Sequence, residues 1–397
     1  METKNQACRQ KIAWARLCCK NITSFEALDL INEEFSVGRA WESSLVLTLR
    51  ELPERILKVI SKVHFIIKRA NSDPSCPIYI QDVSQNGTFV NNEKIGRNKE
   101  HVLKDGDAIS FSQNTDNLLV FVDLRLPVEL TKRYNEIRKL GSGACGLVRL
   151  VSDTSTGQQF AMKIVKKRVS ATARSIDPVL KEVEIMRILS HPCVVRLHDV
   201  HDRPEAIYML LEVVAGGDLC KRIQIKDYLS EEIAKLYFYQ ICHAVKYIHD
   251  CGIIHRDLKL ENVLLATNDE ETLLKVCDFG LSTFMQINLP DEPPVVAQLV
   301  CTPKADIWSL GVLLFCCLSG TWPFSSNEGL TLGDSILSGK FAFNAPQWKN
   351  VSQAAKLLIT EIFNVDPKKR PSIDYILQCT WLKDAPMQQK AKKLMKL

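Results

Sequence analysis

The stretch His255-Arg256-Asp257-Leu258-Lys259-Leu260-Glu261-Asn262 indicates how the second half of the chain folds. It follows a helical pattern over residues 230–250 and precedes a short apolar segment, 263–265, that predicts a strand. At this spacing a carboxylate can accept a proton, a following lysine can screen a transferred phosphoryl group, and an amide can hold a metal ion. Asp278, in Asp-Phe-Gly, offers a second metal ligand. The octet followed by Asp-Phe-Gly therefore predicts phosphoryl transfer, whereas an ordinary charged loop would not need this combination.

The composition is that of a soluble globular protein with 397 residues, of which 46% are hydrophobic and 24% charged. This length allows two or three domains. The net charge of +5 is small, so no direct nucleic-acid binding is predicted. Fourteen cysteines without a signal-like N-terminus indicate a reducing compartment and a protein that is not secreted. The most apolar run, 307–318, is shorter than the ~20 residues of a membrane span, so it predicts a buried helix and no membrane association.

Short β-rich runs separated by turn-forming residues dominate the first third of the chain. They cover residues 35–39, 45–49, 63–68, 78–81, 87–90 and 118–122. Many short strands without helical periodicity predict an all-β sandwich. Residues 1–34 form an N-terminal segment, in which Trp14 and Phe25 are expected to pack on the sandwich as part of a leading strand.

Three loop clusters in this region carry polar groups in a fixed order: Gly38-Arg39, Ser61-Lys62-Val63-His64 and Asn86-Gly87-Thr88. Any one of these residues alone would be read as a solvated surface group. Together they resemble the forkhead-associated (FHA) domain, a reader of phosphothreonine peptides, over residues 35–123.

The FHA resemblance implies a role for each polar residue. Arg39 and Lys62 would contact the phosphate as cations, and Ser61 would donate a hydroxyl hydrogen bond. Asn86 would hold the peptide backbone, and His64 would pack beneath the site in a structural role.

Residues 124–133 are read as a short linker containing Pro127, after which the pattern becomes strand, glycine turn, strand. The turn is Gly141-Ser142-Gly143-Ala144-Cys145-Gly146. In a dinucleotide fold the third glycine opens a helix, but here residues 147–151 continue as a strand. The glycines are therefore expected in a hairpin that closes over phosphates, followed by a strand lysine, Lys163, for the α- and β-phosphates.

A helix is predicted to begin here, with Asp177 as its N-cap and Pro178 in its first turn. Glu182 on this helix is the chosen partner of Lys163, and Glu184 is the alternative. Residues 212–218 are read as an extended hinge whose backbone would hydrogen-bond adenine.

Residues 134–382 resemble a eukaryotic protein kinase domain, with an N-lobe over 134–211 and a C-lobe over 217–382. An FHA domain directly before a kinase resembles the DNA-damage checkpoint kinase 2 family. The resemblance implies an all-β sandwich followed by an α+β bilobal fold, and transfer of the γ-phosphate of ATP, with Mg²⁺, to protein serine or threonine. Lys259, two residues after the catalytic aspartate, favours serine/threonine over tyrosine substrates.

The resemblance also implies site roles. Asp257 would be the base, Lys259 would lie at the γ-phosphate, Lys163 and Glu182 would form the phosphate-anchoring pair, and Asn262 and Asp278 would bind magnesium. His255, Phe279 and Met186 would stack as an internal spine, and Asp306 would anchor the catalytic loop. The residues expected to contact ATP are Leu140, Gly141, Gly143, Gly146, Val148, Ala161, Lys163, Leu211, Glu212, Val214, Asp218 and Leu264.

The segment between Asp278 and Asp306 departs from the family pattern because it is short and contains no Ala-Pro-Glu. One alignment places residues 294–299 on that motif, and a second treats Cys301-Thr302-Pro303 as a remnant of Cys-Gly-Thr-Pro. In both, the glutamate that should pair with Arg370 is missing, and loss of one partner of a buried ion pair can cost ~3–5 kcal/mol. Leu260 also replaces the usual catalytic-loop proline. Arg256 is left with Ser282, Thr283 or Thr302 as phosphorylatable candidates.

Two functions follow from these observations. The first is an ATP-dependent serine/threonine kinase that its FHA domain recruits to phosphothreonine-containing partners. The alternative is a pseudokinase that binds ATP and acts as a phosphothreonine-reading adaptor. Family resemblance further implies a homodimer and a nuclear location, with the cytoplasm as the other possibility. Residues 383–397 are read as a basic C-terminal tail.

Overall fold

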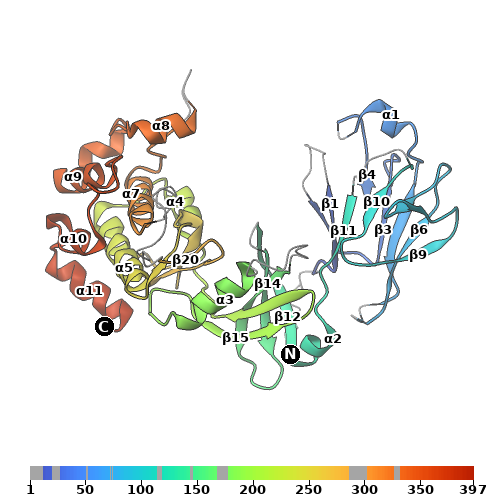
Figure 1. Ribbon diagram of the computed structural model, residues 1–397, viewed down its shortest axis with the longest axis horizontal. Helices are drawn as coiled ribbons and strands as arrows, with labels where there is room; N and C mark the ends of the chain where they lie inside the picture. Colours follow the sequence, from blue (N-terminus) through green and yellow to red (C-terminus); the bar gives the residue numbers. More distant parts are fainter. Residues whose placement is uncertain are drawn as a thin grey trace, which may run out of the picture. The chain divides into compact units, whose positions relative to one another are not determined.

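The computed structural model describes residues 12–19, 27–50, 52–71, 73, 75–113, 119–143, 146–167, 178–285, 302–325 and 331–397. The chain divides into two compact units, Met1–Lys139 with Val151–Gln158 and Leu140–Leu150 with Gln159–Leu397 (Figure 1).

The N-terminal part is a sandwich of two sheets, as the sequence predicts. One sheet has the strand order β2-β1-β11-β10-β7-β8 and the other β4-β3-β5-β6-β9. The strands are β1 (Ala15–Cys19), β2 (Ala27–Leu30), β3 (Glu34–Gly38), β4 (Leu45–Val46), β5 (Phe65–Arg69), β6 (Ile78–Asp82), β7 (Phe89–Val90), β8 (Glu93–Lys94), β9 (Glu100–Leu103), β10 (Ala108–Ser110) and β11 (Leu119–Asp123).

Alternation of buried and partly exposed side chains sets the inner face of each sheet. In β6, Ile78, Ile80 and Asp82 are buried while Tyr79 and Gln81 are partly exposed. Buried residues such as Leu17, Val37, Phe65 and Phe121 fill the space between the sheets.

The leading strand expected from Trp14 is present as β1, which pairs antiparallel with both β2 and β11. The Trp14 side chain is buried, and its Nε1 donates to Asn32 O at 2.9 Å. Phe25 lies outside the described residues. The sequence pattern missed β2, β8, β9 and β10, together with a short helix, α1 (Glu54–Leu57), between β4 and β5.

The segment read as a linker contains a helix, α2 (Val128–Arg133), preceded by Pro127. Its Leu130 is buried, and Thr131 N donates to Pro127 O at 3.0 Å. Residues 128–133 are therefore ordered by a helical turn and by burial, which the sequence pattern did not indicate.

After α2 the chain forms a five-stranded sheet with the order β12-β13-β14-β16-β15. The elements are β12 (Tyr134–Gly143), β13 (Gly146–Asp153), β14 (Gln159–Lys166), β15 (Leu197–Asp202) and β16 (Ala206–Leu211), with helix α3 (Pro178–Ile188) between β14 and β15. Asp177, the predicted N-cap of α3, lies outside the described residues.

The C-terminal part is mainly helical, so the predicted α+β fold is confirmed. Its elements are α4 (Leu219–Lys226), α5 (Glu231–Asp250), β17 (Ile253–Ile254), η1 (Leu260–Asn262), β18 (Val263–Leu265), β19 (Leu274–Val276), β20 (Thr283–Phe284), α7 (Lys304–Ser319), α8 (Leu332–Ser338), η2 (Pro346–Asn350), α9 (Gln353–Ile362), α10 (Ile373–Leu377), η3 (Thr380–Leu382) and α11 (Ala385–Met395). No helix of the described residues is long and apolar enough to cross a membrane.

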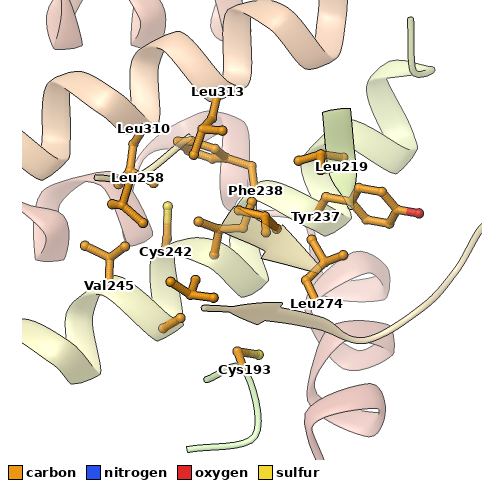
Figure 2. Packing of buried hydrophobic residues seen from close by; sticks show 14 of the residues in the cluster. Cys193, Leu219, Tyr237, Phe238, Cys242, Val245, Leu258, Leu274, Leu310 and Leu313 are labelled. Carbon is orange, nitrogen blue, oxygen red and sulfur yellow. The ribbon is translucent and has the colours of Figure 1, made fainter. Parts of the chain in front are cut away.

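Helix α5 is central to this core. Ser230 caps it by accepting from Ile233 N at 3.3 Å, and Glu231 and Glu232 occupy its first turn, where negative charge is favourable. Figure 2 shows Phe238, Cys242 and Val245 of α5 close to Leu258 and to Leu310 and Leu313 of α7. Leu258, the residue after Asp257, is therefore part of this core.

The segment read as a basic tail is instead a packed helix, α11. Asp384 caps it by accepting from Met387 N at 3.1 Å, and its apolar side chains Met387, Ala391 and Met395 are buried. Lys235 of α5 forms an ion pair with Asp384 at 3.0 Å. Apolar residues at helical spacing within a lysine-rich segment explain the difference, because only one face of the helix is basic.

Candidate functional site

The three polar groups of the 255–262 stretch lie close together after β17. Asn262 Nδ2 donates to Asp257 Oδ2 at 2.9 Å and to Asp257 O at 2.8 Å. Lys259 Nζ lies 2.6 Å from Asp257 Oδ2. Both bonds of Asn262 use its nitrogen, so its Oδ1 remains available as a metal ligand. The predicted base, phosphoryl-screening lysine and amide ligand therefore form one cluster.

Asp306, in the first turn of α7, holds the backbone of this loop. It accepts from His255 N at 2.9 Å and Arg256 N at 2.8 Å, and His249 Nε2 of α5 lies 2.9 Å from its Oδ2. Burial by itself raises the pKa of Asp306, but these hydrogen bonds outweigh it and keep the pKa below its ordinary value. Arg256 has a φ of +70°, a conformation that costs ~1–3 kcal/mol and needs such support.

Lys163 lies between two carboxylates. Its Nζ is 2.7 Å from Glu182 Oε1 of α3 and 2.8 Å from Asp278 Oδ1. Glu184, the alternative partner, is exposed. Burial lowers the pKa of Lys163, but the charges of Glu182 and Asp278 outweigh it and raise the pKa above its ordinary value. The lysine is thus held as a cation.

The donor set fits a magnesium ion. In their charged forms, Lys163, Glu182 and Asp278 together carry a net charge of −1. Burial raises the pKa of Glu182 by more than the nearby charge of Lys163 lowers it. A divalent cation beside Asp278 would offset this excess. Asp278 and Asn262 offer hard oxygen ligands, and Mg²⁺ is usually held by one or two such groups together with phosphates. The described residues contain no cluster of three or more His, Cys, Asp or Glu side chains that could hold a metal. The proposed magnesium donors are of a different kind, one carboxylate and one amide, which phosphates would complete.

His255 links the catalytic loop to Asp-Phe-Gly. Its Nδ1 accepts from Asp257 N at 3.2 Å, so the ring proton is on Nε2, which donates to Cys277 O at 3.2 Å. Burial lowers the pKa of His255, which favours this neutral form. The rings of His255 and Phe279 lie 4.9 Å apart, and Met186 is buried in the core that contains Phe279.

The residues expected to line the nucleotide come from several elements. Ala161 of β14 is paired in register with Leu211 of β16, and Asp218 forms a bridge with Leu264 of β18. Leu140, Gly141 and Gly143 lie in β12, and Val148 lies in β13. Gly146 has a φ of +120°, and a Cβ there would lie 2.4 Å from Ile164 O, so only glycine fits.

The hinge residue Glu212 turns its carboxylate toward neighbouring elements. Its Oε1 accepts from Arg196 N at 2.7 Å and lies 2.9 Å from Lys275 Nζ, and its own N–H donates to Arg196 O at 3.0 Å. The groups left for the predicted contact with adenine are therefore the Glu212 carbonyl and the backbone of Val214. Asp218 caps α4 by accepting from Lys221 N at 2.8 Å.

The segment in which the family motif is missing, 286–301, lies outside the described residues, as do both proposed alignments except Thr302 and Pro303. Arg370, the residue expected to pair with the missing glutamate, has backbone carbonyls as its partners. It donates to Asn364 O at 2.7 Å, Lys304 O at 3.0 Å and Val365 O at 3.1 Å, and its guanidinium lies 4.7 Å from the Trp308 ring centre. No carboxylate forms an ion pair with Arg370 in the part of the chain that the structure describes.

Two of the three phosphorylatable candidates near Arg256 have other partners. Ser282 is buried and donates to His255 O at 3.0 Å. The Thr283 hydroxyl accepts from Lys181 Nζ at 2.7 Å. Thr302 is exposed, and the Arg256 side chain is exposed as well.

In the sandwich, the residues of the predicted phosphothreonine site lie on three loops that are joined through backbone and side-chain hydrogen bonds. Arg39 N donates to Ser61 O at 3.2 Å, and Gln85 N donates to Ser61 Oγ at 3.0 Å, which leaves the Ser61 hydroxyl proton available. Asn86 Nδ2 donates to Val59 O at 2.8 Å. Arg39, Lys62 and Asn86 are exposed.

Close packing requires glycine where the first loop begins. A Cβ on Gly38 would lie 2.1 Å from Lys62 O, so a larger residue would push the two phosphate-site loops apart.

Two buried side chains support these loops. His64 accepts from Ser61 N at its Nδ1 (3.1 Å), so its Nε2 is protonated and donates to Gly87 O at 3.1 Å. Burial lowers the pKa of His64, in keeping with this neutral ring. The structural role predicted for His64 agrees with this geometry.

Sequence reasoning missed the second support, Asp82. Its carboxylate accepts from Ser84 N (2.9 Å), Ser84 Oγ (2.6 Å), Thr88 N (3.1 Å) and Thr88 Oγ (2.8 Å), and so holds the loop that carries Asn86. Burial raises the pKa of Asp82, but these bonds together lower it below 3.8. The available signal was a carboxylate at an inward position of the alternating β6 pattern.

We expect Asp82→Asn to lower the unfolding free energy of the sandwich at neutral pH by about 1–3 kcal/mol, because an amide leaves buried donors unpaired. The folded pKa of Asp82 lies below the unfolded value, so its stabilisation is present above about pH 4 and is lost as the pH falls further. In calorimetry, the difference in melting temperature between wild type and Asp82→Asn should become smaller as the buffer is acidified below pH 4. Glu93→Gln, at an exposed position, should melt like wild type, and a gap that does not depend on pH would contradict the role of Asp82.

We expect Arg370→Lys to lower stability by about 1–3 kcal/mol, because an ammonium cannot serve three separated carbonyls as the guanidinium fork does. The measurement is the denaturant midpoint of the full chain, with Lys369→Met at the exposed neighbouring position as the control. An unchanged midpoint for Arg370→Lys would mean that the carbonyl bonds contribute little.

Comparison with known proteins agrees with this geometry. A model of the protein kinase domain matches residues 134–382, and a model of the FHA domain matches residues 35–112. The ovarian-specific serine/threonine-protein kinase Lok of Drosophila melanogaster is 55% identical over 430 residues, covering 98% of this chain and 90% of the relative. The serine/threonine-protein kinase chk-2 of Caenorhabditis elegans is 32% identical over 388 residues, covering 90% and 80%.

A third relative, the probable serine/threonine-protein kinase fhkC of Dictyostelium discoideum, is 32% identical over 327 residues, covering 76% of this chain and 55% of the relative. The two domain matches and the long alignments agree with the motifs and with the sandwich-plus-bilobal fold. The chain therefore belongs to the checkpoint kinase 2 family of ATP-dependent serine/threonine protein kinases, which join an FHA domain to a protein kinase domain.

Proposed function

We propose that the chain phosphorylates serine or threonine in proteins marked by a nearby phosphothreonine, in DNA-damage checkpoint signalling, with Asp257 as the proton acceptor. The observation that carries the catalytic assignment is the position of Lys163 Nζ, within 2.8 Å of carboxylates from both α3 and Asp-Phe-Gly. This arrangement orients a cation for the α- and β-phosphates.

Each remaining group has a part in the transfer. Asp257 would accept the proton of the substrate hydroxyl, and Lys259, bonded to it at 2.6 Å, would screen charge on the transferred phosphoryl group. Asn262 and Asp278 would hold Mg²⁺, which neutralises phosphate charge when bound. Leu140, Gly141, Gly143, Gly146, Val148, Ala161, Leu211, Glu212, Val214, Asp218 and Leu264 would enclose the nucleotide.

The pseudokinase alternative finds no support in the relatives, which are named serine/threonine kinases. The aligned length with Lok, 430 residues, exceeds the 397 residues of this chain, so the relative has residues that this chain lacks. The short segment after Asp-Phe-Gly is one candidate position for them. The carbonyl bonds of Arg370 offer a way in which the start of α7 stays anchored without the missing glutamate.

The FHA domain would supply the recruitment. Arg39 and Lys62 would bind the phosphate, Ser61 would donate its hydroxyl proton, and Asn86 would hold the peptide backbone. Nuclear residence and a homodimer formed through this domain are proposed from family resemblance.

We expect Asp257→Ala to lower phosphate transfer to a serine/threonine peptide by about 10²–10⁴-fold, because the proton acceptor is lost. The measurement is radiolabelled phosphate transfer by the full chain. Glu184→Ala, at an exposed position of α3, should retain wild-type activity. Equal rates for wild type and Asp257→Ala would reject the assignment.

We expect Arg39→Ala to weaken binding of a phosphothreonine peptide by about 10- to 100-fold, because a charge-assisted hydrogen bond to phosphate is worth roughly 1.5–3 kcal/mol. Fluorescence anisotropy with a labelled peptide measures this, and the same peptide without phosphate should not bind. Arg97→Ala, at an exposed arginine between β8 and β9, is the matched control. Unchanged affinity in Arg39→Ala would place the pocket elsewhere.

A further inference from the structure

Helix α3 carries Glu182, the partner of Lys163, so the orientation of this helix decides whether the ion pair can form. Buried side chains such as Val183 and Met186 pack the inner face of α3 into the core. Apolar packing is non-directional, so it does not by itself fix the rotation of a helix about its own axis. A second polar contact made by the same helix is therefore important for the site.

That second contact comes from Lys181, the residue before Glu182. The Nζ of Lys181 donates to Thr283 Oγ1 at 2.7 Å. Neighbouring residues of a helix project about 100° apart around its axis. The hydrogen bond of Lys181 and the ion pair of Glu182 therefore hold α3 at two different points around its axis, and together they oppose its rotation.

Thr283 lies on a backbone segment that is itself held in place. In β20 it is paired in register with Ile254 of β17, directly before the catalytic loop. The preceding residue, Ser282, is buried and donates its hydroxyl to His255 O at 3.0 Å. The bond from Lys181 therefore connects α3 to the strand pair beside the catalytic loop.

The sequence after Thr283 offers no acceptor for a phosphate until Thr302. Residues 284–301 contain no serine, threonine or tyrosine. In protein kinases, phosphorylation of this segment is one way in which the ion pair between the strand lysine and the helix glutamate is kept in place. Here a hydrogen bond between two unmodified side chains connects α3 to the start of the same segment.

We propose that Lys181 and Thr283 form a positioning pair that keeps α3 in the orientation required for phosphate transfer. The bond replaces an activating phosphate, so the kinase needs no phosphorylation of the segment after Asp-Phe-Gly. This inference rests on the proposed kinase function. Both residues act through Glu182, which orients Lys163, and neither is assigned a contact with ATP or with the substrate.

The size of the expected effect follows from the strength of a hydrogen bond that involves a charged group. Such a bond corresponds to about 10- to 100-fold in an equilibrium constant. Its loss lowers the fraction of molecules in which Lys163 is paired with Glu182, and therefore lowers kcat by up to that factor.

The test measures radiolabelled phosphate transfer to a serine/threonine peptide by the full chain. Lys181→Met and Thr283→Val each remove one side of the bond with little change of shape, and each should lower kcat by about tenfold. The double variant should lose no more than either single variant, because both changes remove the same bond. Lys181→Arg, which keeps a donor, and Thr283→Ser, which keeps the hydroxyl, should retain most of the wild-type rate.

Arg187→Met is the matched control, because Arg187 is an exposed cation on the same helix, and this variant should keep the wild-type rate. Thermal melting of every variant should show that the protein remains folded at the assay temperature. Treatment of wild type with a protein phosphatase should leave its rate unchanged.

Three results would overturn the role of the pair while the kinase function stands. They are unchanged rates in both single variants, additive losses in the double variant, and a rate that falls after phosphatase treatment of wild type. Absence of phosphate transfer by wild type overturns the proposed kinase function and this inference with it.

Discussion

A single buried carboxylate, Asp306, determines the geometry of the catalytic loop. From the first turn of α7, its two oxygens contact the side chain of His249 on α5 and the backbone N–H groups of His255 and Arg256 in the loop. The left-handed backbone of Arg256 would be unfavourable without these bonds. These bonds to Asp306 also fix the backbone position of the next residue, Asp257. The side chain of Asp257 is in turn held by a hydrogen bond from Asn262.

The FHA domain uses the same physical device. Asp82 is buried at the end of β6 and accepts four hydrogen bonds from Ser84 and Thr88, so that the intervening Asn86 is presented to solvent. His64 performs a similar task for the loop that carries Ser61. In the FHA domain, the residues predicted to contact the peptide are exposed, and the residues that fix their loops are buried. A buried carboxylate is expensive unless its lone pairs are filled, and here backbone and hydroxyl donors fill them.

Arg370 lacks a carboxylate partner among the described residues, and backbone carbonyls take that place. An unpaired guanidinium at Arg370 would be costly if it were buried without partners. Three carbonyl oxygens and the face of Trp308 surround it instead, and one of those carbonyls belongs to Lys304 at the start of α7. Asp306 lies in the same turn of α7 as Lys304. Arg370 therefore anchors the first turn of α7 through the carbonyl of Lys304.

The sequence by itself determined the chemistry of the protein and the class of its domains. The 255–262 stretch, Lys163, Asp278 and the three FHA loop clusters are local patterns of residue type and spacing, and six of the sandwich strands show as runs of β-forming residues. These features need only neighbouring residues to be recognised. Lys163 and Glu182 also meet as expected, since helix and strand positions follow from the family pattern.

Only the tertiary structure decided which groups meet across long stretches of chain. The bond from Arg370 to Lys304 O, the meeting of His249 and the catalytic-loop backbone on Asp306, and the contact between Glu212 and Lys275 all depend on packing between segments distant in sequence. Local patterns cannot supply this information, because the free energy of a buried polar group depends on the donors and acceptors that the fold brings to it.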